Sequence, residues 1–353
     1  MISTGTLARR FRHPLIRRFI TAVCGEVFSA ICLVCIMATF CSGNGDLPAG
    51  GSSAMAERMK DRFLSLGGQL MCGQRVKEVI LTPDERKGAG RRAIGIVTEK
   101  GVRLPADQIV YTGDPAVFCG SVIDAPLPHG LESRYRDIGH IRFSGIHAAF
   151  AVPKDAVTFS GDLILPLTGA SGLLPGCDQV ILREFTHEPG FAPEGMTVVQ
   201  ATMFCPEKTA ERVIRLSHDR ETYQTYKQRT ADVFAGAILS ECPAAAGRIR
   251  LLDVWTPASY RRFTGSEIGS FMSFVLRPGD LPRSLDGRIP GVDNVLLAGQ
   301  WLHAPGGLPT AAAEGRRAAG IITERERMPE EERVHTRRLS LGLSPALTGR
   351  EDP

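Results

Sequence analysis

The stretch that determines the fold runs from residue 294 to residue 315 and reads NVLLAGQWLHAPGGLPTAAAEG. An apolar run comes first, then a turn rich in glycine, then an alanine-rich segment. This order predicts a buried strand over 294–298 and a helix over 309–324, with Pro309 in its first turn. Free N–H groups at the helix start, next to bare glycine backbone, suit an anion or an electron-rich flat ligand. A plain strand-to-helix connection explains the same residues equally well.

The rest of the chain alternates predicted strands and helices, which indicates an α/β fold. Amphipathic or apolar periodicity predicts helices over residues 27–41, 54–66, 209–216 and 221–239. Short runs rich in β-branched or apolar residues predict strands over residues 76–81, 93–97, 101–104, 106–111, 147–152 and 196–204. The mixed-charge segment 326–353 predicts a flexible tail with little packed structure.

Length and composition indicate a globular protein. The 353 residues are enough for two domains, and 43% of them are hydrophobic while 23% are charged. The net charge of +4 and the 7% of aromatic residues are not those of a nucleic-acid binder. Nine cysteines are an odd number for a disulfide scaffold, so we expect a cytoplasmic protein with reduced thiols.

The segment 27–41 is the most apolar of the chain. Its 15 or so residues fall short of the ~20 needed to span a bilayer, so we expect a buried or membrane-touching helix. The arginines between Arg9 and Arg18 leave open a peripheral contact with the inner face of a membrane. Cys32 and Cys35 have metal-ligand spacing, but the surrounding run is apolar. We therefore predict buried thiols at Cys24, Cys32, Cys35 and Cys41 and no metal site.

Taken as a motif, the 294–315 stretch resembles the C-terminal FAD segment of phytoene desaturases and carotenoid isomerases, within the amine oxidase-like flavoproteins. Further stretches resemble the same family in the same order, and the resemblance covers roughly residues 10 to 325. They are a P-x-G-G segment at 48–51, a V-x-x-I strand at 73–79, an A-D-x-V-V strand at 106–110 followed by Asp114-Pro115, and a T-P segment from 256 to 270.

The resemblance implies an FAD-binding site and a two-part architecture. The implied cofactor-binding residues are Val76, Gly299, Gln300, Trp301, Gly306, Gly307, Leu308 and Pro309. The family more often has a small residue where this chain has Trp301. Residues 48–115 plus 291–325 are expected to form a Rossmann-like FAD/NAD(P)-binding domain. Residues 1–47 plus 116–290 are expected to form an inserted α+β domain for an apolar, isoprenoid-like small molecule.

One part of the family pattern has no counterpart. The family opens with a strand, a G-x-G-x-x-G loop and a helix, where the FAD pyrophosphate docks. Residues 88–93 fit the letters, but they follow a charged turn and precede a strand-like run, so we take the match as chance. We expect the first βαβ unit to be missing, the chain to begin inside the substrate-binding region, and FAD binding to be weak.

The implied activity is that of an FAD-dependent oxidoreductase, with desaturation and isomerisation both open. The alternative is an inactive remnant or a binding domain. No catalytic residue is singled out, because in a flavoenzyme the cofactor carries the redox chemistry. His303 alone among eight histidines lies in a motif, where a contact with flavin or substrate and a surface hydrogen bond are both open. The pattern favours no oligomeric state.

Overall fold

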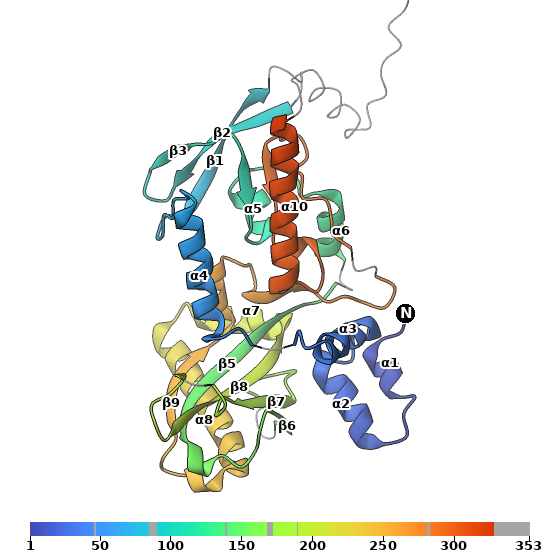
Figure 1. Ribbon diagram of the computed structural model, residues 1–353, viewed down its shortest axis with the longest axis vertical. Helices are drawn as coiled ribbons and strands as arrows, with labels where there is room; N and C mark the ends of the chain where they lie inside the picture. Colours follow the sequence, from blue (N-terminus) through green and yellow to red (C-terminus); the bar gives the residue numbers. More distant parts are fainter. Residues whose placement is uncertain are drawn as a thin grey trace, which may run out of the picture.

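The computed structural model describes residues 1–45, 47–84, 90–137, 140–167, 172–188, 190–280 and 283–327. Helices and strands are mixed along these residues, which confirms the α/β class (Figure 1). The helices are α1 Thr4–Ala8, α2 Pro14–Cys24, α3 Ala30–Cys41, α4 Gly51–Ser65, α5 Pro115–Ser121, α6 His129–Arg136, α7 Glu207–Leu216, α8 Arg220–Glu241, α9 Pro257–Thr264 and α10 Leu308–Arg327, with short 3₁₀ turns η1 Lys154–Ala156, η2 Pro243–Ala245 and η3 Gln300–Leu302.

The strands form three sheets. The smallest pairs β4 Ile109–Tyr111 with β11 Val295–Leu297, and an antiparallel sheet has the order β1-β2-β3. The largest has the order β10-β5-β8-β7-β6, with β9 also paired to β5. The remaining strands are β1 Val76–Asp84, β2 Gly90–Thr98, β3 Arg103–Pro105, β5 Arg142–Pro153, β6 Asp162–Pro166, β7 Gln179–Glu184, β8 Met196–Pro206, β9 Arg250–Trp255 and β10 Ser270–Phe274.

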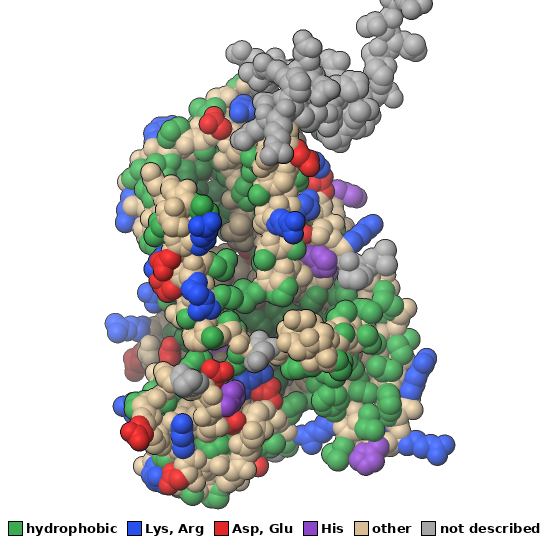
Figure 2. All heavy atoms as spheres, viewed as in Figure 1, with side chains coloured by type: hydrophobic (Ala, Val, Ile, Leu, Met, Phe, Trp, Pro, Cys, Tyr) green, Lys and Arg blue, Asp and Glu red, His purple; other side chains and the backbone are tan. Residues whose placement is uncertain are grey.

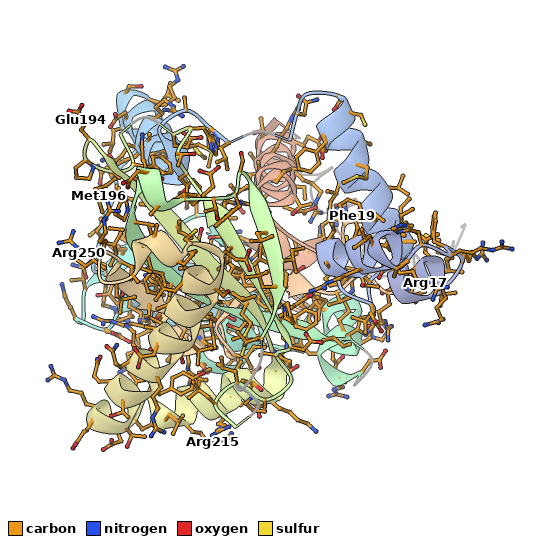
Figure 3. All side chains as sticks on the ribbon, turned by 90° about the horizontal axis from the view of Figure 1, so that it is seen from below. Arg17, Phe19, Glu194, Met196, Arg215 and Arg250 are labelled. Carbon is orange, nitrogen blue, oxygen red and sulfur yellow. The ribbon has the colours of Figure 1, made fainter. Side chains whose placement is uncertain are left out.

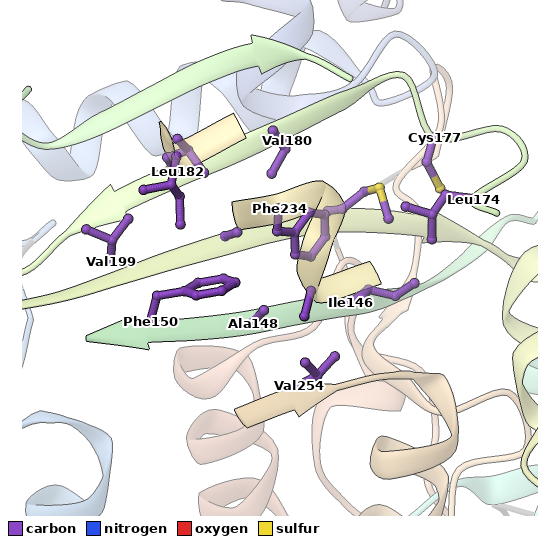
Figure 4. Close-up of a cluster of buried hydrophobic side chains, with 14 of the residues drawn as sticks. Ile146, Ala148, Phe150, Leu174, Cys177, Val180, Leu182, Val199, Phe234 and Val254 are labelled. Atoms are coloured by element: carbon purple, nitrogen blue, oxygen red, sulfur yellow. The ribbon is translucent and has the colours of Figure 1, made fainter. Parts of the chain in front are cut away.

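One hydrophobic core lies between the six-stranded sheet and α8 (Figure 4). Strand β5 alternates its side chains, so Ile146, Ala148 and Phe150 share one face and are almost fully buried. Phe234 and Ile238 of α8 pack on that face. The period of two in β5 and the helical period in α8 therefore explain why these distant segments meet.

A second core joins segments from both ends of the chain. It packs Leu33 of α3, Val79 of β1, Phe118 of α5, Val295 of β11 and Trp301. The segments 48–115 and 291–325 thus share one core, and the first helices and α5 contribute to it as well. The division of the chain into an FAD domain and a substrate domain stays a proposal.

Asn294 ties the three-stranded sheet to β11. Its side chain is 1% exposed; Oδ1 accepts from the Ala93 backbone N–H at 2.9 Å, and Nδ2 donates to the carbonyls of Ala93 and Asp107, each at 2.7 Å. A main-chain amide on one strand is thereby satisfied by a side chain more than 200 positions along the chain. The amide side chain takes the place of a ladder hydrogen bond between two separate sheets.

We expect Asn294→Ala to lower the free energy of unfolding by about 3 kcal/mol, because three buried hydrogen bonds are lost at roughly 1 kcal/mol each. Urea titration followed by circular dichroism measures the change. Asn44→Ala is the matched control, since Asn44 is exposed and, among the described residues, its side chain bonds only to the Ser42 hydroxyl. A surface change of that kind stays within about 0.5 kcal/mol. Equal midpoints for the two variants would contradict the role assigned to Asn294.

Several sequence expectations need correction. The helix predicted over 27–41 is α3, but it begins only at Ala30, after the turn that follows Gly25 at the end of α2. Cys35 and Cys41 are exposed rather than buried, whereas Cys24 and Cys32 are buried as expected. In the predicted tail, residues 326 and 327 belong to α10, and 328–353 lie outside the described residues. Among the helices that the structure describes, none is long and apolar enough to cross a membrane.

Candidate functional site

The predicted strand and helix around the glycine-rich turn are confirmed. Val295, Leu296 and Leu297 are each at most 2% exposed and pair in parallel with Ile109, Val110 and Tyr111 of β4. The helix α10 begins at Leu308, one residue earlier than predicted. Both elements form because the apolar run is buried on both sides and because Pro309 suits the first turn of a helix.

Gly299 makes the turn that leaves β11. It has φ 93° and ψ −172°, a region that side chains exclude. A Cβ atom there would also lie 3.1 Å from the Thr112 carbonyl oxygen. Next, the Gln300 side chain folds back, and its Oε1 accepts from the Gly307 N–H at 3.3 Å. This hydrogen bond holds Gly307, at the far end of the turn, in position.

Gly306 and Gly307 have positive φ values of 91° and 99°, but their surroundings differ. A Cβ on Gly306 would lie 3.0 Å from the Ser273 backbone nitrogen, so this glycine allows the turn to pack on β10. A Cβ on Gly307 would meet only the Pro309 Cδ, at 4.0 Å. Gly307 therefore presents bare backbone to open space, while Gly299 and Gly306 serve the packing of the protein itself.

The start of α10 lies directly behind Gly307. Leu308 is 65% exposed, Pro309 is exposed, and the Thr310 hydroxyl donates to the Gly307 carbonyl at 2.9 Å. N–H groups in the first turn have no acceptor within the helix, so they add a positive end next to the bare backbone. The buried Ser273 Oγ beside the turn has no hydrogen-bond partner among the described residues. These donors suit an anion or an electron-rich ring edge.

The other residues suggested by the sequence are Trp301, Val76 and His303. Trp301 is 3% exposed; its ring packs 5.5 Å from Phe274 and 5.9 Å from Tyr135, so its side chain belongs to the core. Val76 opens β1 in the three-stranded sheet, whereas Gly299 follows β11 of the two-stranded sheet. His303 is half-buried, and its Nδ1 lies 3.3 Å from the Ser284 hydroxyl.

Asp114 appears in the sequence motif, but its role as a buried hydrogen-bond acceptor was not predicted. This 1% exposed carboxylate accepts from the Ala116 N–H, the Tyr135 hydroxyl, the Ser266 hydroxyl and the Glu267 N–H, at 3.0, 2.6, 3.2 and 3.1 Å. Burial, together with the adjacent Asp114 carboxylate, raises the pKa of Tyr135 well above its usual range. The phenol therefore stays protonated and keeps donating. An Asp-Pro pair before a helix was the available signal, since Asp is a common helix N-cap.

A family model for flavin-containing amine oxidoreductases matches residues 4–323. The chain belongs to this family. The match spans the glycine-rich turn, β11 and most of α10, as well as the six-stranded sheet. A comparison with curated protein sequences finds no significant match.

Solved structures resemble this flavin-family chain only distantly. An oxidoreductase from Methanosarcina mazei has 15% identity and a TM-score of 0.46, over 78% of this chain and 55% of that one. Cyclohexylamine oxidase from Brevibacterium oxydans has 13% identity and a TM-score of 0.46, over 93% of this chain and 68% of that one. A putrescine oxidase redesigned in cofactor binding has 14% identity and a TM-score of 0.48, over 92% of this chain and 68% of that one. The chain thus spans about half the length of the Methanosarcina protein, and the likeness is too distant to support a functional inference.

The turn of this family member fits a flavin. Gly307 offers bare backbone to a planar group, the α10 start offers N–H donors and positive potential, and Ser273 offers an unused hydroxyl close by. The G-x-G-x-x-G match at 88–93 does not form a comparable cofactor-binding turn, because residues 90–93 lie within β2. Residues 88 and 89 are outside the described residues. Within the described ranges no group of three or more His, Cys, Asp or Glu could hold a metal ion.

An apolar cavity of about 230 Å³ adjoins the turn through Pro305. Helices α2 and α3 form one wall, and strands β5, β7 and β8 form the other. The lining residues are Val23, Cys24, Gly25, Phe28, Cys32, Ile36, Phe143, Gly176, Cys177, Asp178, Gln179, Ile181, Thr202, Met203, Phe204, Pro206, Met272 and Pro305. Burial raises the pKa of the Cys24 and Cys32 thiols to about 11, so at neutral pH they act as small apolar groups.

Proposed function

We propose that this chain is part of an FAD-dependent oxidoreductase of the phytoene desaturase and carotenoid isomerase type. Its substrate would be an apolar, isoprenoid-like molecule, with desaturation and isomerisation as the two candidate reactions. The observation that carries the proposal is the apolar cavity that ends at Pro305, inside the turn that fits a flavin. A ligand in this cavity would lie next to a ring resting on Gly307.

The cavity lining favours an uncharged substrate over an amine. Among the lining side chains that the structure describes, the one carboxylate is Asp178, which is exposed, and there is no lysine or arginine. Binding a charged ammonium group in an apolar site without a paired carboxylate is costly. Phe28, Phe143 and Phe204 instead offer ring faces and edges to a polyene. A volume of about 230 Å³ is smaller than a typical ligand pocket of roughly 300–1,000 Å³, so it would hold one end of an elongated molecule.

When bound, the flavin would supply the redox chemistry by accepting an electron pair from the substrate. The protein would orient both molecules. Gly307 and the first turn of α10 would hold the electron-rich edge of the ring, and Gln300 would keep Gly307 in position. The rings of Phe143 and Phe204, 6.5 Å apart, would line the substrate and exclude water.

The test is binding of retinol, a fluorescent isoprenoid, to the purified chain. We expect saturable enhancement of retinol fluorescence, and at least about tenfold weaker binding in Phe204→Glu, because a charge then faces the apolar cavity. Phe263→Glu is the matched control: its ring is also exposed but stacks on Trp255, outside the cavity lining.

Two outcomes would contradict the proposed substrate class. One is displacement of retinol by putrescine or cyclohexylamine at equal concentrations, which would favour an amine. The other is equal retinol affinity in the Phe204 and Phe263 variants, which would place the binding outside the cavity. Tight retinol binding without any flavin binding would favour the alternative, a binding domain without redox activity.

A further inference from the structure

The turn after α1 and the first part of α2 expose a continuous run of side chains. Every residue from Arg9 to Phe19 is exposed. Four of these residues are large and apolar, and five are arginines. We call them together the basic-apolar surface: Phe11, Leu15, Ile16 and Phe19 with Arg9, Arg10, Arg12, Arg17 and Arg18.

Three of these apolar residues, Leu15, Ile16 and Phe19, lie on α2, whose apolar face is only partly buried. Helix α2 is strongly amphipathic, yet it buries just Ile20, Ala22 and Cys24. Leu15 is 69% exposed and Phe19 is 51% exposed. At 100° per residue, Leu15, Ile16 and Phe19 continue the apolar face beyond its buried edge, whereas Arg17 and Arg18 lie across the helix from it. An apolar face left open in water indicates something that covers it.

The N-terminal region that contains this surface is predominantly basic. Residues 1–45 contain five arginines, no lysine and a single acidic residue, Glu26, so their formal charge equals the +4 of the whole chain. Among the described residues, no carboxylate forms an ion pair with these arginines. Arg17 instead donates to the Phe11 carbonyl, and Arg9 donates to the Thr6 hydroxyl.

Both features gather on one side of the molecule. Figure 2 shows hydrophobic side chains massed over α1–α3, with basic side chains at the rim. In Figure 3, Arg17 and Phe19 lie on the α2 side of the molecule, across from Arg250 and Glu194. A helix lying in a bilayer interface combines such an apolar face with arginines that reach the lipid phosphates.

We propose that the basic-apolar surface docks this protein on an anionic lipid membrane. Charge complementarity favours this occupant over a second copy of the chain, because two such surfaces would bring ten arginines together without counter-charges. It also favours lipid over nucleic acid, whose recognition would leave Leu15, Ile16 and Phe19 without an apolar partner. The proposal stands independently of the flavin function.

The helix that carries the basic-apolar surface also forms part of the cavity wall. Val23 and Cys24, on the last turn of α2, line the cavity, while Leu15 and Phe19 lie up to two turns earlier on the same helix. A membrane touching the first turns of α2 would therefore lie close to the apolar cavity. If the proposed function holds, an isoprenoid dissolved in the bilayer would have a short path into it.

Co-sedimentation of the full chain with lipid vesicles tests the docking. We expect binding to vesicles of phosphatidylcholine mixed with phosphatidylglycerol, and much weaker binding to phosphatidylcholine alone. Arg17→Gln with Arg18→Gln should weaken binding about 25-fold at low salt. Leu15→Ser with Phe19→Ser should weaken it at least about tenfold. All four side chains are exposed, so circular dichroism should show unchanged folding.

Helix α4 provides the matched control. It also exposes large apolar side chains, among them Phe63 at 49% and Leu66 just after its end at 68%, but Glu57 and Asp61 offset two of its three basic residues. Phe63→Ser with Leu66→Ser should leave vesicle binding unchanged. The proposal is overturned if mixed vesicles do not bind the chain, or if the α4 variant loses as much binding as the α2 variants. It is also overturned if light scattering shows that the α2 changes split a dimer while vesicle binding is unaffected.

Discussion

Replacing Asp114 by alanine is expected to lower the free energy of unfolding by about 4 kcal/mol, among the largest effects of a single substitution. The carboxylate accepts four hydrogen bonds in a buried site, and bonds to a charged group are worth roughly 1.5–3 kcal/mol each before partial compensation. It also caps helix α5. Its loss would leave the Tyr135 and Ser266 hydroxyls without their acceptor.

Urea unfolding measures this effect, with the midpoint falling and the slope unchanged if the variant still folds. Asp155→Ala is the control, because Asp155 pairs with Arg248 on the surface and its side chain is 69% exposed. An exposed ion pair contributes about 1 kcal/mol or less. If the Asp114 and Asp155 variants unfold at the same urea concentration, the Asp114 network does not hold the structure together.

The second large effect concerns the cofactor: the 353-residue chain should bind FAD about a thousandfold more weakly than a site with a pyrophosphate loop. The turn at Gly307 would hold the ring end, but no strand–glycine loop–helix segment is apparent in the sequence for the pyrophosphate. Such a loop donates several charge-assisted hydrogen bonds of roughly 1.5–3 kcal/mol each, and each 1.4 kcal/mol is a factor of ten. Titration with FAD, followed by visible absorbance after dialysis, measures the affinity.

Leu308→Glu separates flavin contact from a general loss of structure. A carboxylate in the first turn of α10 stabilises the helix, so the melting temperature should stay equal or rise. The same charge faces the proposed electron-rich edge, so FAD binding should weaken about fivefold. Unchanged affinity would place the flavin away from Leu308. A yellow protein that retains stoichiometric FAD through dialysis would show that another segment holds the pyrophosphate.

The strand, turn and helix between 294 and 324 could be predicted because each depends on neighbours in sequence. Apolar residues in a short run, glycines at positive φ and a proline in the first helical turn act locally. The same holds for β8 and α8, whose periods are visible in the sequence. The resemblance in residues 48–51, 106–115 and 294–315 led to the flavin family for the same reason.

Roles that depend on distant partners could not be predicted. Trp301 sits in the cofactor motif, yet its side chain fills a core built with Tyr135 and Phe274. Asn294 is predicted as the first residue of a strand, but its side-chain amide forms hydrogen bonds with the backbone of Ala93 in a different sheet. Cys35 looks buried in an apolar run, but α3 turns it towards solvent. Each outcome depends on which surface packs against the residue.

By itself, then, the sequence determined the α/β class, the strand and helix around Gly306 and Gly307, and the family. The tertiary structure decided the rest. It showed which glycine is open, since Gly306 packs on Ser273 and Gly307 faces free space. It also brought α2, α3 and β8 around one apolar cavity and left half of α2 uncovered. The physical reason is that backbone conformation is set by neighbours in sequence, whereas burial is set by packing between segments far apart in the chain.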